Sequence, residues 1–246
     1  MTADTAAETS PAGGAPDVGA LARIPGALFS PGRTFEAIAR RPTWIPPVVL
    51  WTILSIAIAV VLVPRIDYEK LTRRAMEKRG QTVSEDRLQT IVEQQKKIGG
   101  AFTYAISACT PVVITLLVAA VLLGSFKAFG WELTFKQSLG ATAHAFLPGM
   151  IGAILLLVLL PRQETVDPSA IGDLLRSNLG FLVERDSAKA LHSLLGSLDL
   201  FSIWSLVLFT VGYSAAAKIR RGQAAAVVVS LWAVFVLARA GLAAVF

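Results

Sequence analysis

Residues 101–126 decide the fold: AFTYAISACTPVVITLLVAAVLLGSF. This stretch contains no Asp, Glu, Lys or Arg. The hydrocarbon core of a bilayer, about 30 Å thick, is crossed by roughly 20 mainly apolar residues in a helix. Backbone groups in lipid need hydrogen bonds within their own segment, and the stretch lacks the alternation of barrel strands. It therefore predicts a transmembrane helix.

Four further apolar runs have the length of a span: residues 45–63, 143–160, 200–217 and 224–246. The chain is 54% hydrophobic and only 16% charged, whereas soluble domains carry about 25% charged residues. The predicted fold class is all-α: a polytopic membrane protein with a bundle of five transmembrane helices and amphipathic helical connections. Residues 44–246 form this five-span domain.

The charge and the rare residues exclude several classes of function. The formal net charge is +6, but the basic residues lie between the apolar runs, which favours anionic lipid headgroups over nucleic acid. One cysteine and two histidines exclude an intrachain disulfide and give no zinc cluster of their own. No Walker loop, GxGxxG turn, nucleophile elbow, HExxH or CxxC is present. We therefore expect no enzyme activity and no cofactor.

Residues 64–100 and 161–199 connect spans, and each predicts a pair of amphipathic helices on the membrane or over the bundle. In the first connection, Thr82 and Glu85 have capping-box spacing, and Gly99–Gly100 predicts a helix stop. In the second, two leucine-rich faces have helical spacing: Ile171, Leu174, Leu175 and Leu179, then Leu191, Leu194, Leu195 and Leu198.

A short motif occurs at the ends of two spans, as LVPR at 62–65 and as LLPR at 159–162. It indicates either an internal duplication of the kind found in transporters or simply the preference of Pro and Arg for the end of a span. Four carboxylates follow the two motifs and predict either a cation site or a solvated face; they are Asp67, Glu69, Glu164 and Asp167.

The N-terminal 43 residues divide into two parts. Residues 1–20 are rich in Ala, Pro, Gly and Thr and predict a disordered tail. Residues 21–43 predict a basic amphipathic helix in the membrane interface, capped by Ser30, started by Pro31 and broken at Arg41–Pro42. This helix is either a topology anchor or a docking surface for lipid and a cytoplasmic partner. The predicted contact residues are Phe29, Arg33, Phe35, Arg40, Arg41 and Trp44.

Two ionisable residues fall within predicted spans. His144, at the start of the third, is the candidate intramembrane polar site, about one turn before a predicted kink at Pro148–Gly149. It serves either as a proton relay or as a hydrogen-bonding group at headgroup depth. Arg239 lies seven residues from the C-terminus and is expected to snorkel to the interface. Cys109 is expected to be a packing residue, and Gly212 and Ala216 allow close helix packing, including packing between copies.

The strings LFSPGRTFEAIARRPTWIPPVVL (28–50), GWELTFKQSLGATAHAFLPGMIG (130–152) and LDLFSIWSLVLFTVGY (198–213) resemble bacterial members of the Ypt-interacting-protein (Yip) domain family. The likeness runs from about residue 21 to 239. It implies an integral membrane protein with a cytoplasmic N-terminus. Eukaryotic relatives are linked to Rab-type GTPases, but their Asp-Leu-x-Gly-Pro signature is replaced here by DLFSIW at 199–204. The resemblance therefore does not extend to a GTPase partner for this chain.

Topology follows from the Lys and Arg distribution. A cytoplasmic N-terminus places nine inside and thirteen outside, which alone opposes that orientation. The long connections obey the positive-inside rule weakly, however, and KIRR (218–221) is concentrated in a very short turn. We predict a multi-pass protein of the bacterial cytoplasmic membrane with its N-terminus inside. The predicted function is membrane organisation or adaptor activity; the alternative is a small transporter or channel.

Overall fold

The computed structural model describes residues 19–77, 79–81, 84–184 and 188–245. Five helical segments in this part are long and apolar enough to cross a membrane: Ile45–Arg65, Glu85–Ala128, Phe135–Arg162, Leu200–Ala217 and Arg221–Val245. The described residues form no β-strand and contain two isolated bridges. The prediction of an all-α, five-span membrane protein is confirmed. The predicted tail lies almost wholly outside the described residues.

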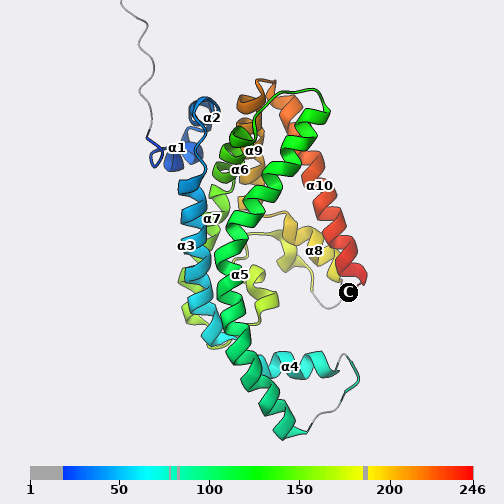
Figure 1. Cartoon of the computed structure of the whole chain (residues 1–246). Coiled ribbons are helices and arrows are strands. Elements are labelled where there is room, and N and C mark those ends of the chain that lie inside the picture. The colour runs from blue at the N-terminus through cyan, green and yellow to red at the C-terminus, as the bar shows by residue number, and fades with distance from the viewer. Residues whose placement is uncertain (1–18, 78, 82–83, 185–187, 246) are drawn as a thin grey trace, which may run out of the picture.

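The spans form a bundle whose elements run between two ends (Figure 1). The first span is α3 (Ile45–Leu62) with the short 3₁₀ helix η1 (Val63–Arg65), and the second is α5 (Glu85–Ala128). The third consists of α6 (Phe135–Ala145), α7 (Leu147–Leu159) and η2 (Leu160–Arg162). The last two are α9 (Leu200–Ala217) and α10 (Arg221–Val245). Helix α5 packs on α3 and α6, and α9 packs on α6, α7 and α10.

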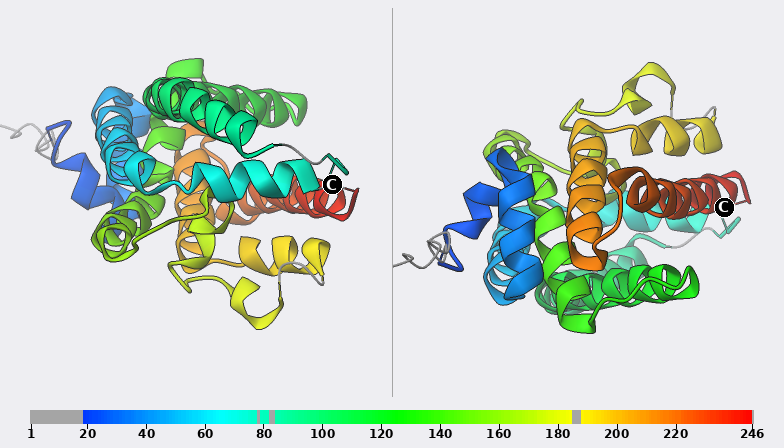
Figure 2. Two further views of the ribbon diagram at one scale, coloured as in Figure 1. Left: turned by 90° about the horizontal axis from the view of Figure 1, so that it is seen from below. Right: turned by 90° about the horizontal axis from the view of Figure 1, so that it is seen from above.

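One end of the bundle, here called the hairpin end, holds residues 19–43, 127–137 and 218–223. It includes α1 (Arg23–Phe29) and α2 (Pro31–Arg40) (Figure 2, right). The other end, here called the α4 end, holds the described residues of the two connections, 64–100 and 161–199. It includes α4 (Tyr68–Glu77), η3 (Pro168–Asp173), η4 (Leu179–Leu182) and α8 (Lys189–Ser197). The spans expose many large apolar side chains, for example Ile53, Leu117 and Val234, as lipid contact requires.

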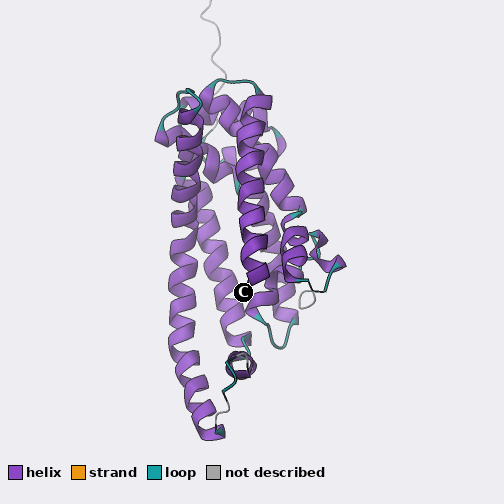
Figure 3. Cartoon of the chain, turned by 90° about the vertical axis from the view of Figure 1, so that its right-hand side faces the viewer, coloured by secondary structure: helices purple, strands orange, loops and turns teal. Residues whose placement is uncertain are grey.

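Helix α5 does not stop at Gly99–Gly100, and the predicted separate helix before that point is wrong. Its 44 residues give a length of about 66 Å, twice a bilayer core, so its first turns project beyond the bundle beside α4 (Figure 3). The two glycines instead allow close packing. A Cβ at Gly99 would lie 3.4 Å from Tyr68 Cε1, and one at Gly100 would lie 3.3 Å from Val63 Cγ1. Ser84 is the N-cap residue, and Thr82 lies outside the described residues.

The second connection also differs from prediction. The predicted amphipathic α-helix is replaced by two separate 3₁₀ helices, η3 and η4, because Asn178 turns the chain between them. Its Oδ1 accepts from Gly180 N, and its Nδ2 donates to Gly172 O. The apolar set still packs, since Ile171, Leu174 and Leu175 cover a cluster at the span ends. Helix α8 forms as predicted but buries Ser193 and Ser197 most deeply, whereas Leu191 is 48% exposed.

Candidate functional site

Two short helices, rather than the single helix predicted over 21–43, form a hairpin at the end of the bundle. The chain turns at Ser30, whose side chain makes no capping bond; Thr34 Oγ1 donates instead to Ser30 O at 3.0 Å. Pro31 starts α2, and the helix ends at Arg41, before a proline. A Cβ at Gly26 would lie 2.7 Å from Thr34 Oγ1, so the close approach of α1 to α2 requires glycine there.

The apolar face of α2 packs on the bundle and not in lipid. Phe35 and Ile38 are each 1% exposed. A Cβ at Gly212 of α9 would lie 2.9 Å from the Phe35 ring, and a Cβ at Gly140 of α6 would lie 2.9 Å from Ile38 Cγ2. The absence of a side chain at Gly212 therefore leaves room for Phe35, and its absence at Gly140 leaves room for Ile38. Phe35 is a packing residue in this structure, which contradicts its prediction as a surface contact.

The remaining predicted contact residues lie at the surface of the hairpin end. Phe29 is 79% exposed, Arg33, Arg40 and Arg41 are exposed, and Trp44 is half-buried beside the start of α3. The fold adds cations from two other loops, because the ends of α5 and α9 reach the same end of the bundle (Figure 2, right). These exposed residues are Lys127, Lys136, Lys218, Arg220 and Arg221.

A pocket of about 800 Å³ opens between the ends of α5 and α9 and the start of α6. Lys127 and Lys218 line it together with the aromatic ring of Trp131. Thr134 closes the adjoining end of α6 with a capping box, in which Gln137 N donates to Thr134 Oγ1 and Thr134 N donates to Gln137 Oε1. Gln137 also ties this loop to α2 by donating from Nε2 to Ala39 O at 2.9 Å.

The two ends of the molecule differ in charge. The three segments of the hairpin end contain nine Lys and Arg but only two acids, Glu36 and Glu132. The two connections of the α4 end contain thirteen Lys and Arg and twelve acids. The hairpin end therefore carries a net charge of +7 and the α4 end a net charge of +1. An anionic surface is attracted to the hairpin end far more strongly.

His144 lies inside the bundle, and its prediction at the start of the third span is wrong. The span begins at Phe135, and His144 is fully buried next to the break between α6 and α7. Its Nδ1 lies 2.9 Å from Gly140 O, and its ring meets Phe35 edge-on with centroids 6.5 Å apart. Nε2 has no hydrogen-bond partner among the described residues. The predicted kink before Pro148 is confirmed as this helix break.

A hydroxyl network that the sequence reasoning missed lies in the same layer. Tyr213 Oη of α9 lies 2.5 Å from Ser138 Oγ and 2.9 Å from Thr142 Oγ1, both on α6. Ser138 Oγ also donates to Ala119 O of α5 at 2.7 Å. All three side chains are fully buried, so the network joins three spans in an apolar interior. The spacing of Ser138 and Thr142 by four residues was its only signal in the sequence.

Comparison with protein families decides the assignment. The Yip1 domain model matches residues 26–242, from α1 into α10. The chain belongs to the Yip1 domain family. The match includes the hairpin from Gly26 onward, and with it α2, and it reaches all five spans. No curated protein and no solved structure matches the chain.

Arg23 is a further residue of the hairpin that sequence reasoning missed, because it was counted there only among the topology charges. It is 3% exposed, and its Nη1 donates to Arg41 O at 2.6 Å and to Thr43 Oγ1 at 3.1 Å. It thereby ties the start of α1 to the linker between α2 and α3. Nothing in the local pattern distinguishes this arginine from its exposed neighbours.

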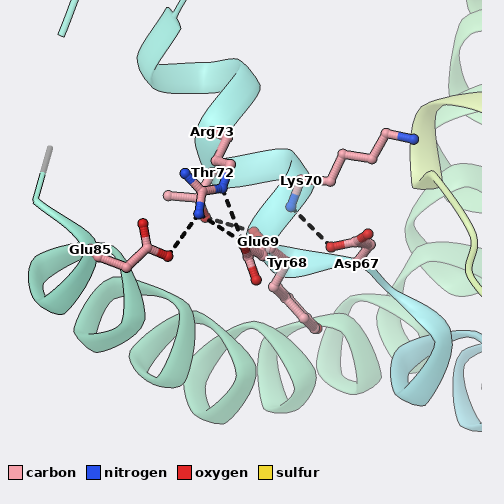
Figure 4. A network of polar contacts seen from close by, with 7 residues as sticks. All are labelled: Asp67, Tyr68, Glu69, Lys70, Thr72, Arg73 and Glu85. Carbon is pink, nitrogen blue, oxygen red and sulfur yellow. Dashed lines mark hydrogen bonds and ion pairs between the residues drawn. The ribbon is translucent and has the colours of Figure 1, made fainter. Parts of the chain in front are cut away.

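The α4 end of the Yip1 domain is held by polar contacts between its helices (Figure 4). Arg73 pairs with Glu69 at 2.9 Å and with Glu85 at 2.8 Å, and hydrogen bonds to these two carboxylates raise its pKa. Thr72 Oγ1 lies 2.9 Å from Gln95 Oε1. Burial, and then the neighbouring Tyr104, raise the pKa of Tyr68.

Three of the four carboxylates that follow the two motifs make contacts at this end: Asp67, Glu69 and Asp167. Asp67 Oδ1 accepts from Lys70 N at 2.9 Å, which caps α4, and Asp167 pairs with Arg74 at 2.7 Å. In the described part of the chain, no group of three His, Cys, Asp or Glu side chains is placed to hold a metal ion.

Cys109 is exposed on α5, so its prediction as a packing residue is wrong.

Proposed function

We propose that this Yip1-domain protein is a non-enzymatic membrane-organising or adaptor protein of the bacterial cytoplasmic membrane, with the hairpin end in the cytoplasm. The observation that carries the proposal is the charge difference between the ends, +7 against +1. Each Lys or Arg near an anionic surface contributes about 1 kcal/mol of attraction. The hairpin end thus holds anionic headgroups and presents Arg33, Arg40 and Arg41 to a cytoplasmic protein.

The docked hairpin supports the adaptor role because it is a rigid surface. The apolar side of α2 is occupied by the bundle, so its polar side faces outward in a fixed orientation. A surface that is already ordered loses little conformational entropy when it binds a partner. The exposed Phe29 supplies an apolar anchor next to the arginines.

Crosslinking in native membranes tests the proposal. The full chain is compared with the variant R33Q/R40Q/R41Q and with the matched control R79Q/R87Q/R176Q, which removes three exposed arginines from the α4 end. We expect a specific protein to co-purify with the wild type and the control and to be lost from the hairpin variant. Equal capture by all three forms, or the recovery of lipid alone, would contradict the adaptor role.

A transporter or channel is the second candidate, and the buried polar groups favour it. His144, Tyr213, Ser138 and Thr142 lie within the spans, and intramembrane polar groups often mark transport pathways. Vesicles reconstituted with the wild type and with His144→Ala would be compared for ion and metabolite flux. Flux through the wild type that the substitution abolishes would support this function, and the absence of flux in both would remove it.

A further inference from the structure

The two Pro-Arg motifs, 97 residues apart in the chain, lie side by side at the α4 end. Each forms a 3₁₀ turn at the end of its span, η1 after α3 and η2 after α7. The chains that leave them pair directly: Val166 N donates to Arg65 O at 2.8 Å, and Ile66 and Val166 form a parallel bridge. The sequence likeness of LVPR and LLPR is therefore matched by similar structure and by contact.

Packing below and beside the two turns holds them together. Leu62 of the first motif and Leu160 of the second form one buried cluster with Leu156 and Val166. The Arg74–Asp167 ion pair adds a second link between the connections that follow the two motifs. Residues on both turns consequently keep fixed relative positions.

Both motifs line one pocket of about 420 Å³, formed by Pro64, Arg65, Pro161, Arg162, Gln163 and Glu164. Arg65 donates from Nη1 to Val61 O at 2.7 Å, which closes the end of its own span. Neither Arg65 nor Arg162 forms an ion pair with a carboxylate of the described residues. The nearby Arg73 and Arg74 do form such pairs, so the two motif arginines are distinguished from them by their available guanidinium groups.

We propose that the paired Pro-Arg turns form a binding site for a phosphate group. A guanidinium presents a planar fork of donors that fits phosphate oxygens, and two such forks contributed by separate turns can hold one phosphate from two sides. The pocket lies at the ends of two of the five candidate spans, and the end of a span in a bilayer is where the headgroups of one leaflet are found. Glu164 lines the same pocket and opposes the negative charge of the ligand.

The site is independent of the proposed adaptor function, because it lies at the end of the bundle away from the hairpin. Two sources of phosphate fit the chemistry, a phospholipid headgroup and a soluble phosphate. Purified full-length protein in detergent would be titrated with dioctanoyl phosphatidylglycerol, and bound lipid counted by native mass spectrometry. Inorganic phosphate would be added as the competing soluble probe.

We expect one saturable phosphatidylglycerol per chain, and a loss of affinity of at least about tenfold in R65Q/R162Q, since hydrogen bonds to charged groups are lost. R162Q alone is also tested, because the exposed Arg162 side chain makes no hydrogen bond or ion pair with the described residues, so we expect its replacement to leave the fold intact. E164Q should bind more tightly. The matched control R87Q/R176Q removes two exposed arginines of the same end and should bind as the wild type does.

Three results would overturn the site: unchanged affinity in R65Q/R162Q, an equal loss in R87Q/R176Q, or weaker binding in E164Q. Competition by inorganic phosphate at concentrations similar to those of the lipid would support a soluble phosphate as the ligand. Saturable lipid binding that inorganic phosphate does not displace would support a phospholipid headgroup. Either outcome of this competition retains the phosphate site and identifies the source of its ligand.

Discussion

Replacing Gly212 by alanine should weaken the packing of the N-terminal hairpin, through Phe35 of α2, on α9. The new Cβ would lie 2.9 Å from two carbons of the Phe35 ring and 3.3 Å from Ala141 Cβ. Carbon atoms normally approach to about 3.5–4.0 Å, so the ring must withdraw by about 0.6–1 Å. Phe35 is 1% exposed and bordered by His144, and the ring can withdraw only if α2 moves with it. Overpacking of this kind costs about 1–3 kcal/mol.

A matched glycine separates this effect from helix propensity. Alanine is favoured over glycine inside a helix by up to about 1 kcal/mol, and Gly124 of α5 has nothing within 4 Å of an added Cβ. Gly124→Ala should therefore stabilise the protein. Gly212→Ala should be less stable than Gly124→Ala by about 1–3 kcal/mol. Unfolding by SDS titration in mixed micelles measures both variants.

Two further measurements connect the loss to α2. Phe35→Leu shortens the side chain that meets Gly212, so in the Gly212→Ala background it should recover stability, as a positive coupling in a double-mutant cycle. A buried cysteine on α2 reports its movement: Thr34, which is 8% exposed, is replaced by Cys in a Cys109→Ser background. Maleimide should label this cysteine faster when Gly212→Ala is also present. If Gly212→Ala is as stable as Gly124→Ala and leaves the labelling rate unchanged, the reasoning is refuted.

Three other predictions concern the polar contacts. Tyr213→Phe should lower the free energy of unfolding by about 1–3 kcal/mol, because the buried hydroxyls of Ser138 and Thr142 lose a partner. Tyr68→Phe should be neutral or stabilising, because the buried Tyr68 hydroxyl has no partner among the described residues. SDS titration of both variants checks this contrast, and equal destabilisation would contradict it. Burial raises the pKa of Tyr68 in the folded state, because the folded protein favours the neutral phenol over the phenolate. This preference leaves stability unchanged below the unfolded pKa of about 10, and stability is lost as pH rises from there through the folded pKa. After correction for the base-catalysed rise of the intrinsic exchange rate, the protection of α4 amides from hydrogen exchange should fall there in the wild type and not in Tyr68→Phe. Arg74→Gln breaks a partly exposed ion pair and should cost less than about 1 kcal/mol, an effect that 1 M salt abolishes in the same titration.

The sequence by itself determined the class of fold, the number of spans and most of their limits. These properties depend on local composition: any uncharged run of about 20 residues must span as a helix, because lipid offers no other partner for the backbone. The start of α3 at Ile45 and both limits of α9 were predicted on this basis. The break before Pro148 was predicted because proline acts on its own turn.

Only the tertiary structure decided what each face of a helix contacts. An apolar stripe such as Phe35–Ile38 has the same pattern whether it enters lipid or a protein groove, and Gly212 and Gly140, distant in sequence, made it a packing surface. Likewise, Gly99–Gly100 has the composition of a helix stop, but in the fold Tyr68 packs on Gly99 and Val63 packs on Gly100. The convergence of Arg65 with Arg162, and of Tyr213 with Ser138, depends on how spans are arranged around one another. Hydropathy is a property of each segment, whereas these sites depend on pairs of segments, and a single sequence does not encode that pairing in any local pattern.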